Sequence, residues 1–267
     1  MYNGVGGSSL HYTAVWLRLR PSDFRRGSEH GLAPDWPISY WDLAPYYDRA
    51  DDVIGISGLA GDPAYPARPP RPCPPLPLGG TGRAAARGLR KLGWHHWPLE
   101  LAVLSRDRGG RPACNHCGGC QAGCPRGSLG SSSVTWWPRA LRDGAVLRSG
   151  VLAERILRDG RGRACGIQCL DSASGSRSVV HADRVVICAN GIGTPRLLLL
   201  SDLPDRSDQT GRNLMHHGLA VIEAWLPDIV GSHQGAVGGA LYTAEFAEPT
   251  AASGDVSTDS PWSPARD

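Results

Sequence analysis

Four cysteines lie within eleven residues at short, regular intervals, Cys114-x2-Cys117-x2-Cys120-x3-Cys124, and Pro125 follows them. Thiolates at these intervals match the cluster-binding run of bacterial ferredoxins, and the intervening glycines let the backbone wrap closely around a ligand. The spacing therefore predicts that Cys114, Cys117, Cys120 and Cys124 hold an iron-sulfur cluster. A zinc site, one or two local disulfides, and thiols that only pack a tight loop remain open as alternatives.

Two glycine-containing turns have the residue types of a phosphate-binding site. The first is Gly4-Val5-Gly6-Gly7-Ser8-Ser9, where glycines permit close backbone approach and serine hydroxyls add donors. Taken alone, such a loop is also typical of an ordinary turn, and it lacks the G-x-G-x-x-G fingerprint. The second is the turn in VVICANGIGTPRLLLLS, where the free amides of a helix N-terminus could face an anion. An ordinary strand-to-helix turn explains that pattern equally well.

The histidines form two adjacent pairs, His95-His96 and His216-His217. Adjacent side chains point in different directions on a helix or a strand, so neither pair makes a natural chelate. We interpret both pairs as structural. The sequence contains no G-x-S-x-G, H-E-x-x-H or Walker motif, which excludes the usual hydrolase, zinc-protease and NTPase chemistries.

The elements that position these residues follow from apolar spacing and turn residues. Helices are predicted over 42–54, over 83–92 before Gly93, over 138–142 as a single turn, and from Thr194-Pro195 through Ser201. Short strands are predicted over 145–148, 151–157, 164–170 and 177–180, and a buried parallel strand over 185–189. Apolar and polar side chains alternate over residues 11–19, which predicts a strand or the first turns of a helix. Eight prolines within residues 63–77 exclude a helix there and favour an extended strap.

The amino-acid composition limits the class of protein to which this chain can belong. The chain has 267 residues, of which 41% are hydrophobic and 20% charged, a balance typical of a globular protein with one large or two ordinary domains. A formal net charge of +3 is too small to indicate a nucleic-acid partner. No apolar stretch reaches the length of a membrane span, and the first residues lack the pattern of a signal peptide, so a cytoplasmic location is expected.

Four segments, in this order, resemble the glucose-methanol-choline (GMC) family of FAD-dependent oxidoreductases. They are GVGGSSLHYTAVWLRLRPSDF, DWPISYWDLAPYYDRADDVIGISG, ANGIGTPRLLLLSDLP and GRNLMHHG. The cysteine run is similar to the branch of gluconate, fructose and other sugar dehydrogenase large subunits. The resemblance implies an α/β fold class, with an incomplete GMC-type FAD-binding domain and part of an antiparallel-sheet substrate domain. The implied division is 1–217 for the FAD-binding domain, including the proline-rich strap (63–77) and the cysteine cluster (114–124), 218–249 for the start of the substrate domain, and 250–267 for a disordered tail.

The resemblance also implies which residues bind FAD. Those beside the pyrophosphate and ribityl chain are Gly6, Gly7, Ser8 and Ser9, and those under the isoalloxazine are His11, Tyr12 and Thr13. Ala153 falls on the strand that meets the adenine, and Ala189, Asn190 and Gly191 return the chain to the cofactor. Asn213 and His217 fall on the family's N-L-x-x-H motif.

The expected function is that of a partial FAD-dependent oxidoreductase, which transfers hydride from a CH–OH group of an alcohol or sugar to the flavin. The family's nucleotide fingerprint and catalytic histidine pair have no counterpart in this sequence, so we assign no catalytic residue and expect weak or no flavin binding. The expected partners are a small-molecule alcohol or sugar and an electron-acceptor subunit. Two alternatives stay open: an iron-sulfur or metal-binding electron-transfer subunit, and a non-functional remnant.

Overall fold

The computed structural model describes residues 2–31, 33–231, 233–236 and 240–247. The chain divides into two compact units, which are treated separately below. Unit 1 comprises Met1–Ala145 and Trp225–Asp267, and unit 2 comprises Val146–Ala224. The predicted tail, 250–267, lies outside the described residues.

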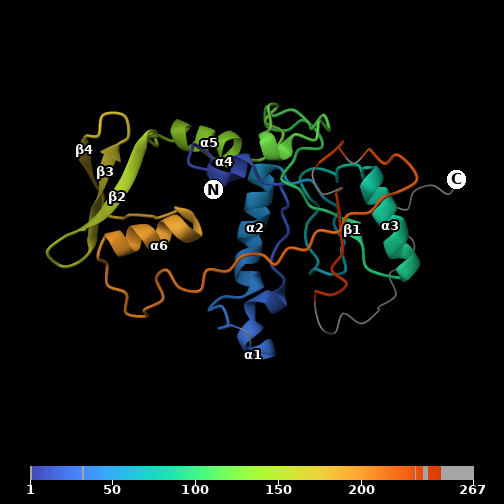
Figure 1. Cartoon of the computed structure of the whole chain (residues 1–267), viewed down its shortest axis with the longest axis horizontal. Coiled ribbons are helices and arrows are strands. Elements are labelled where there is room, and N and C mark those ends of the chain that lie inside the picture. Colours follow the sequence, from blue (N-terminus) through green and yellow to red (C-terminus); the bar gives the residue numbers. More distant parts are fainter. Residues whose placement is uncertain (1, 32, 232, 237–239, 248–267) are drawn as a thin grey trace. The chain divides into compact units, whose positions relative to one another are not determined.

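The helices of unit 1 are short except for two (Figure 1). The long ones are α2 (Tyr40–Ile54) and α3 (Gly80–Leu92), which confirms both predicted helices to within a few residues. The shorter ones are η1 (Gly7–Leu10), η2 (Pro21–Phe24), α1 (Arg26–His30), η3 (Cys120–Ala122), α4 (Ser132–Thr135) and α5 (Trp137–Arg142). α2 begins where Ser39 and Asp42 form a reciprocal capping box, which satisfies two amides of its first turn.

Residues 99–104, with the sequence LELAVL, form the centre of unit 1. All six are at least 94% buried, and Leu101, Ala102 and Leu104 are completely buried. Their backbone groups form hydrogen bonds with three distant segments. Leu101 exchanges hydrogen bonds with Ser57, Ala102 N donates to Ala14 O (2.8 Å), and Leu104 N donates to Ser128 O (3.0 Å). The core of unit 1 therefore assembles around one extended segment and not around a regular sheet.

The last described segment of unit 1 is fastened to the same core. β5 (Leu241–Tyr242) pairs antiparallel with β1 (Trp97–Pro98), and Leu99 N donates to Ala240 O at 2.8 Å. The ring of Phe246 lies edge-on to that of Trp94, with the centroids 4.8 Å apart. Residues 240–247 are thus part of unit 1, although 150 residues separate them from their partners in the chain.

Unit 2 is an antiparallel sheet with one helix. β2 (Val151–Arg158), β3 (Ala164–Asp171) and β4 (Arg177–His181) form the order β2-β3-β4, and α6 (Asn190–Leu200) packs beside β2 (Figure 1). Ile156 and Leu197 are buried, and Ser201 Oγ links their elements by accepting from Ile156 N (2.9 Å) and donating to Leu197 O (2.6 Å). The three predicted strands and the mixed helix and antiparallel-sheet character are confirmed.

Two predicted strands are wrong. Residues 145–148 and 185–189 form no strand, and Val146 and Val186 are 83% and 84% exposed. A strand requires a neighbour for its backbone groups, and neither segment has one in the described part of the chain. Among the residues that the structure describes, the segment 11–19 likewise makes only the single bridge between Val15 and Leu101.

The leucine-rich helix begins four residues earlier than predicted. Asn190 Oδ1 accepts hydrogen bonds from Ile192 N (2.8 Å) and Gly193 N (3.0 Å), so its side chain satisfies the amides of the first turn. Pro195 consequently lies inside α6 and not at its start. The proline-rich residues 63–77 form no helix, as predicted, but they are not extended throughout: residues 63–65 make a turn in which Tyr65 N donates to Asp62 O (3.2 Å).

Candidate functional site

The Gly/Ser loop leads into η1 and is held by α4. Gly6 and Gly7 have φ angles of 99° and 54°, a region that favours glycine. Ser9 Oγ donates to Gly6 O (2.5 Å) and accepts from Ser132 N (3.0 Å), while Ser132 Oγ also donates to Gly6 O (3.1 Å). The hydroxyl of Ser9 therefore stabilises the loop itself and is engaged within the protein.

Gly7 leaves open space on the surface of this loop. A Cβ atom built at Gly7 would meet no atom within 4 Å, whereas one built at Gly6 would come within 3.2 Å of Ser133 Cβ. Backbone with a positive φ and no side chain allows a ligand to approach the amides closely. Gly7 has this geometry, which other glycines of unit 1 such as Gly61 share, so the binding of a phosphate or flavin chain at Gly7 stays a prediction.

The three residues that follow η1 differ in exposure and contacts. The Nδ1 atom of the exposed His11 ring lies 3.2 Å from Gln121 O. Tyr12 is half-buried, and its hydroxyl donates to Gly130 O (3.1 Å). Burial raises the pKa of Tyr12 to about 12, against the opposing charge of Arg111, so its hydroxyl stays protonated. Thr13 is half-buried beside it.

The remaining predicted cofactor residues belong to unit 2. Ala153 lies in β2 opposite Cys169, next to an irregularity in the pairing at Glu154. Ala189 is the N-cap of α6, and Asn190 has a φ angle of 64° with its side chain engaged in the first turn. Gly191 is the second residue of the helix. The convergence of these residues with the Gly/Ser loop on one cofactor stays a prediction.

The four clustered cysteines surround η3. Cys120 is buried, Cys114 and Cys124 are half-buried, Cys117 is exposed, and all four are free thiols. Within the described ranges, no group of three or more His, Cys, Asp or Glu side chains is placed to hold a metal ion. Ligation of a cluster by these thiols therefore stays a prediction.

Two of these thiols have shifted acidities. Burial raises the pKa of Cys114, and the neighbouring cysteines add to the effect. Burial acts in the same sense on Cys124, but hydrogen bonds from backbone amides in residues 126–129 outweigh it and lower the pKa of Cys124. Cys124 is the one of the two whose surroundings favour the thiolate.

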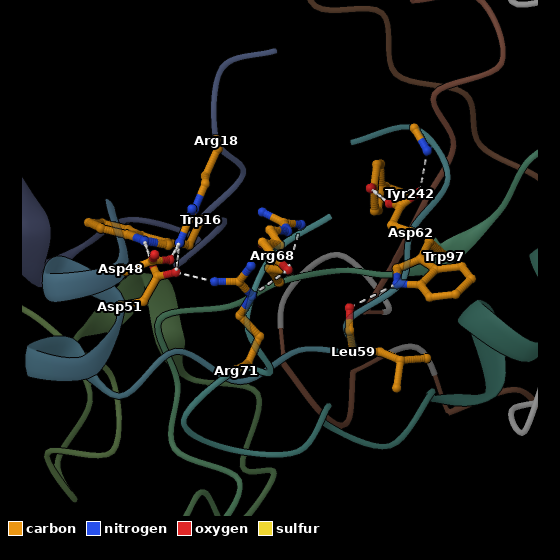
Figure 2. Close-up of polar contacts among 12 residues, drawn as sticks. Trp16, Arg18, Asp48, Asp51, Leu59, Asp62, Arg68, Arg71, Trp97 and Tyr242 are labelled. Atoms are coloured by element: carbon orange, nitrogen blue, oxygen red, sulfur yellow. Dashed lines mark hydrogen bonds and ion pairs between the residues drawn. The ribbon is translucent and has the colours of Figure 1, made fainter. Parts of the chain in front are cut away.

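A network of buried charges joins α2 to the central segment of unit 1 (Figure 2). Asp51 accepts from Trp16 Nε1 (2.9 Å) and Arg18 Nη2 (2.5 Å), and it forms an ion pair with Arg71. Arg71 Nε also donates to Glu100 Oε1 (2.9 Å). The side chains of Asp51 and Arg71 are 4% and 2% exposed, so solvent does not screen these pairs.

Arg68 completes this network at Glu100, with Nη2 and Oε1 2.8 Å apart. Burial raises the pKa of Glu100, and the opposing charges of Arg68 and Arg71 reduce the effect. Burial also lowers the pKa of Arg71. The buried N–H groups without a hydrogen-bond partner in this network, among the residues described, are Arg18 Nε, Arg68 Nη1 and Arg71 Nη2.

A second polar cluster joins Asp62, the residue before the strap, to residues 240–247 of unit 1. Asp62 accepts from Tyr242 and from His95 Nε2 (2.9 Å), as Figure 2 shows for Tyr242. Burial by itself would raise the pKa of Asp62. The hydrogen bonds from His95, Tyr242 and Ala64 outweigh that effect, so the pKa of Asp62 lies below its usual value. Burial and the charge of Asp62 raise the pKa of Tyr242.

His95 has no nitrogen left for a substrate. Ala244 N donates to Nδ1 (2.9 Å), so Nε2 carries the proton that Asp62 accepts. His95 is therefore a structural residue, as the sequence suggested. His216 and His217 are exposed in unit 2, and Asn213 has a φ angle of 58°.

Sequence reasoning missed both polar clusters. Their members are up to 180 residues apart, and single Arg, Asp and Glu residues carry no local signature. One signal was present: Glu100 interrupts the apolar run LELAVL, where a buried charge requires a partner.

The comparisons with known proteins agree with one another on family. The family model described as GMC oxidoreductase matches residues 2–219. The chain is 42% identical over 257 residues to a 2-methyl-1,2-propanediol dehydrogenase of Mycolicibacterium austroafricanum, covering 92% of this chain and 46% of the relative. It is 34% identical to the fructose dehydrogenase large subunit of Gluconobacter japonicus, covering 80% and 41%.

Two further similarities are to an oxidase and to a solved structure. The chain is 32% identical to the 6'''-hydroxyparomomycin C oxidase of Streptomyces lividus, covering 82% of this chain and 41% of the relative. A solved FAD-dependent oxidoreductase from Chaetomium thermophilum aligns with a TM-score of 0.49 at 16% identity, covering 74% and 34%. The chain spans less than half the length of each of these relatives. Every helix in the described part of the chain is too short or too polar to cross a membrane.

Proposed function

Because the chain belongs to the GMC oxidoreductase family, we propose that it is part of an FAD-dependent oxidoreductase that oxidises the CH–OH group of a small alcohol or sugar. The observation that carries this proposal is the 42% identity to a diol dehydrogenase over 92% of the chain. The similarity to a fructose dehydrogenase and to a hydroxyparomomycin oxidase supports a polyhydroxylated substrate.

The residues of unit 1 fit one part of the cofactor. The open, positive-φ backbone at Gly7 would hold the pyrophosphate or ribityl chain, and the half-buried Thr13 would face the ring system. FAD, when bound, supplies the acceptor for the hydride of the alcohol carbon. Ser9 would act by keeping the loop in shape, because its hydroxyl is bonded to Gly6 and Ser132.

No residue of this chain is proposed as the catalytic base. Both nitrogens of His95 are engaged inside the protein, and His216 and His217 are solvent-exposed without a partner that would orient them within the described part of the chain. The proposed contribution of this chain is therefore to bind and shape a cofactor site, and proton transfer is supplied elsewhere in the holoenzyme.

A second role is proposed for the cysteine run, as the place where electrons leave the flavin through an iron-sulfur cluster to an acceptor subunit. The ferredoxin-like spacing supports it, and so do the amides that stabilise the Cys124 thiolate. Eight free thiols are also consistent with a reducing, cytoplasmic compartment, which we propose as the location.

The test is a titration of the 267-residue chain with FAD, followed by anaerobic addition of small diols and sugars. Because the family's nucleotide fingerprint has no counterpart in this sequence, we expect FAD to bind weakly, with quenching of flavin fluorescence that saturates only at high FAD concentration. In the holoenzyme, substrate should bleach the visible flavin absorption. Gly7→Val should weaken FAD binding by about tenfold, because a side chain would fill the open space.

Gly61→Val is the matched control, since Gly61 also lies in unit 1, has a φ angle of 90° and faces open space. Equal weakening in both variants, or no saturable quenching by the parent chain, would count against the proposed cofactor site. Iron and labile sulfide that disappear in Cys120→Ser would support the electron-transfer role.

A further inference from the structure

Unit 1 contains a cavity of about 340 Å³ that no predicted flavin residue lines. Its walls come from the end of α2 (Asp52 to Gly55), the turn at residues 108–111, and α4 and α5. This volume lies near the lower end of the range of roughly 300–1,000 Å³ that is usual for small-molecule sites. The space suits a small ligand and not a dinucleotide.

The charge around this cavity is strongly unbalanced. Four arginines line it, the half-buried Arg108 and Arg111 and the exposed Arg139 and Arg142, against the single acidic residue Asp52. Arg108 pairs with Asp52 at 2.5 Å. The other three arginines form no ion pair within the described ranges of the chain. Three cationic groups therefore share one concave space without an anionic partner, which attracts an anion.

Arg111 is fixed in place by neutral acceptors. Its Nη1 donates to Ile54 O (2.7 Å), its Nε to Gly127 O (2.9 Å) and its Nη2 to Ser128 O (3.0 Å). Carbonyl oxygens orient the guanidinium but leave its full positive charge, and two of its five N–H bonds remain for another acceptor. Little reorganisation is needed for Arg111 to bind an anion.

Arg139 and Arg142 add two more donors from α5. They are three residues apart, so they lie on the same side of the helix. Arg142 Nε donates to Pro138 O (3.2 Å), which leaves both terminal amino groups for a ligand. The Arg139 guanidinium makes no hydrogen bond to any residue that the structure describes.

The cavity lies on a different part of α4 from the Gly/Ser loop. Ser132 bonds to Gly6 and Ser9, whereas Val134 and Thr135 line the cavity. A ligand in the cavity would therefore share α4 with the loop without occupying the same space.

From the excess of guanidinium groups and the size of the space, we propose that this cavity binds the phosphate group of a small ligand. Planar guanidinium forks match the oxygens of a phosphate and form charge-assisted hydrogen bonds with them. The same chemistry is offered by free phosphate and by a phosphate monoester.

The experiment is isothermal titration calorimetry of the full 267-residue chain with inorganic phosphate and, separately, with glycerol 3-phosphate, at constant ionic strength in chloride. We expect saturable binding of at least one of them. Arg139→Gln/Arg142→Gln should weaken it about tenfold, because two of the donors are lost. Tighter binding of glycerol 3-phosphate would identify a phosphate ester as the ligand, and equal or tighter binding of phosphate would identify the free ion.

The control is Arg87→Gln/Arg90→Gln on α3. Like the test variant, it removes two positive charges that are three residues apart on a helix. Arg90 Nε also donates to the carbonyl four residues earlier (3.3 Å), as Arg142 does. Circular dichroism of both double variants checks that they fold alike. The proposal fails if neither anion saturates, if both double variants lose binding equally, or if FAD displaces the anion competitively.

Discussion

Asp51 is the residue on which the buried charges of unit 1 depend. Its two carboxylate oxygens accept from Trp16, Arg18 and Arg71, which come from two separate segments of the chain. A buried carboxylate in this position compensates guanidinium groups that have no access to water. Asp48 contacts the same Arg18 at 2.6 Å, but its side chain is 42% exposed.

We expect Asp51→Asn to lower the free energy of unfolding by about 3–5 kcal/mol, because it leaves buried guanidinium groups without a counter-charge. Asp48→Asn, the matched control on the same arginine, should lower it by about 1 kcal/mol or less. Urea-induced unfolding followed by tryptophan fluorescence measures both. Similar losses in the two variants would contradict the central role of Asp51.

At the scale of elements, α2 and α3 end in the same way but in different surroundings. Gly55 and Gly93 follow the two helices with φ angles of 82° and 69°, in the left-handed conformation that closes many helices. A Cβ at Gly55 would lie 2.5 Å from Leu104 Cδ2, whereas one at Gly93 would meet no atom within 4 Å. Only the end of α2 is packed against the core.

Gly93→Ala should therefore cost about 1–2 kcal/mol of stability, from the left-handed backbone alone. Gly55→Ala should cost about 1–3 kcal/mol more, because Leu104 is completely buried and cannot move aside freely. The difference between the two variants in chemical denaturation isolates the packing contribution. If Gly55→Ala is no worse than Gly93→Ala, the close contact with Leu104 does not limit the end of α2.

At the scale of the whole molecule, the chain has two separate cores. The core of unit 1 surrounds residues 99–104, and Ile56 within it is completely buried. The core of unit 2 is smaller and includes Ile156 and Leu197, which are 4% and 5% exposed. Compact units with their own cores are expected to unfold as separate cooperative steps.

Differential scanning calorimetry should accordingly show two transitions. Leu197→Ala should lower the midpoint of one and Ile56→Ala that of the other, because each change removes about 2–5 kcal/mol from one core. A single transition that both substitutions shift equally would show that the chain unfolds as one cooperative body.

The sequence by itself determined the local elements and the family. The apolar spacing predicts α2, Gly93 predicts the end of α3, and turn residues predict the three strands of unit 2. The Gly/Ser loop and the segment around Asn190 carry the resemblance that the family model confirms over residues 2–219. These features depend on neighbours within a few residues, which the sequence shows directly.

Only the tertiary structure decided which distant residues meet. It brings Asp51 to Arg71, Asp62 to Tyr242, and four arginines to one cavity, and it leaves residues 185–189 without a partner strand. The apolar run at 185–189 and the run at 99–104 look alike in the sequence, yet only the second is buried at a centre of hydrogen bonding. The reason is physical: a strand or a buried charge is stabilised by the partner that the folded backbone supplies, and no local pattern specifies that partner.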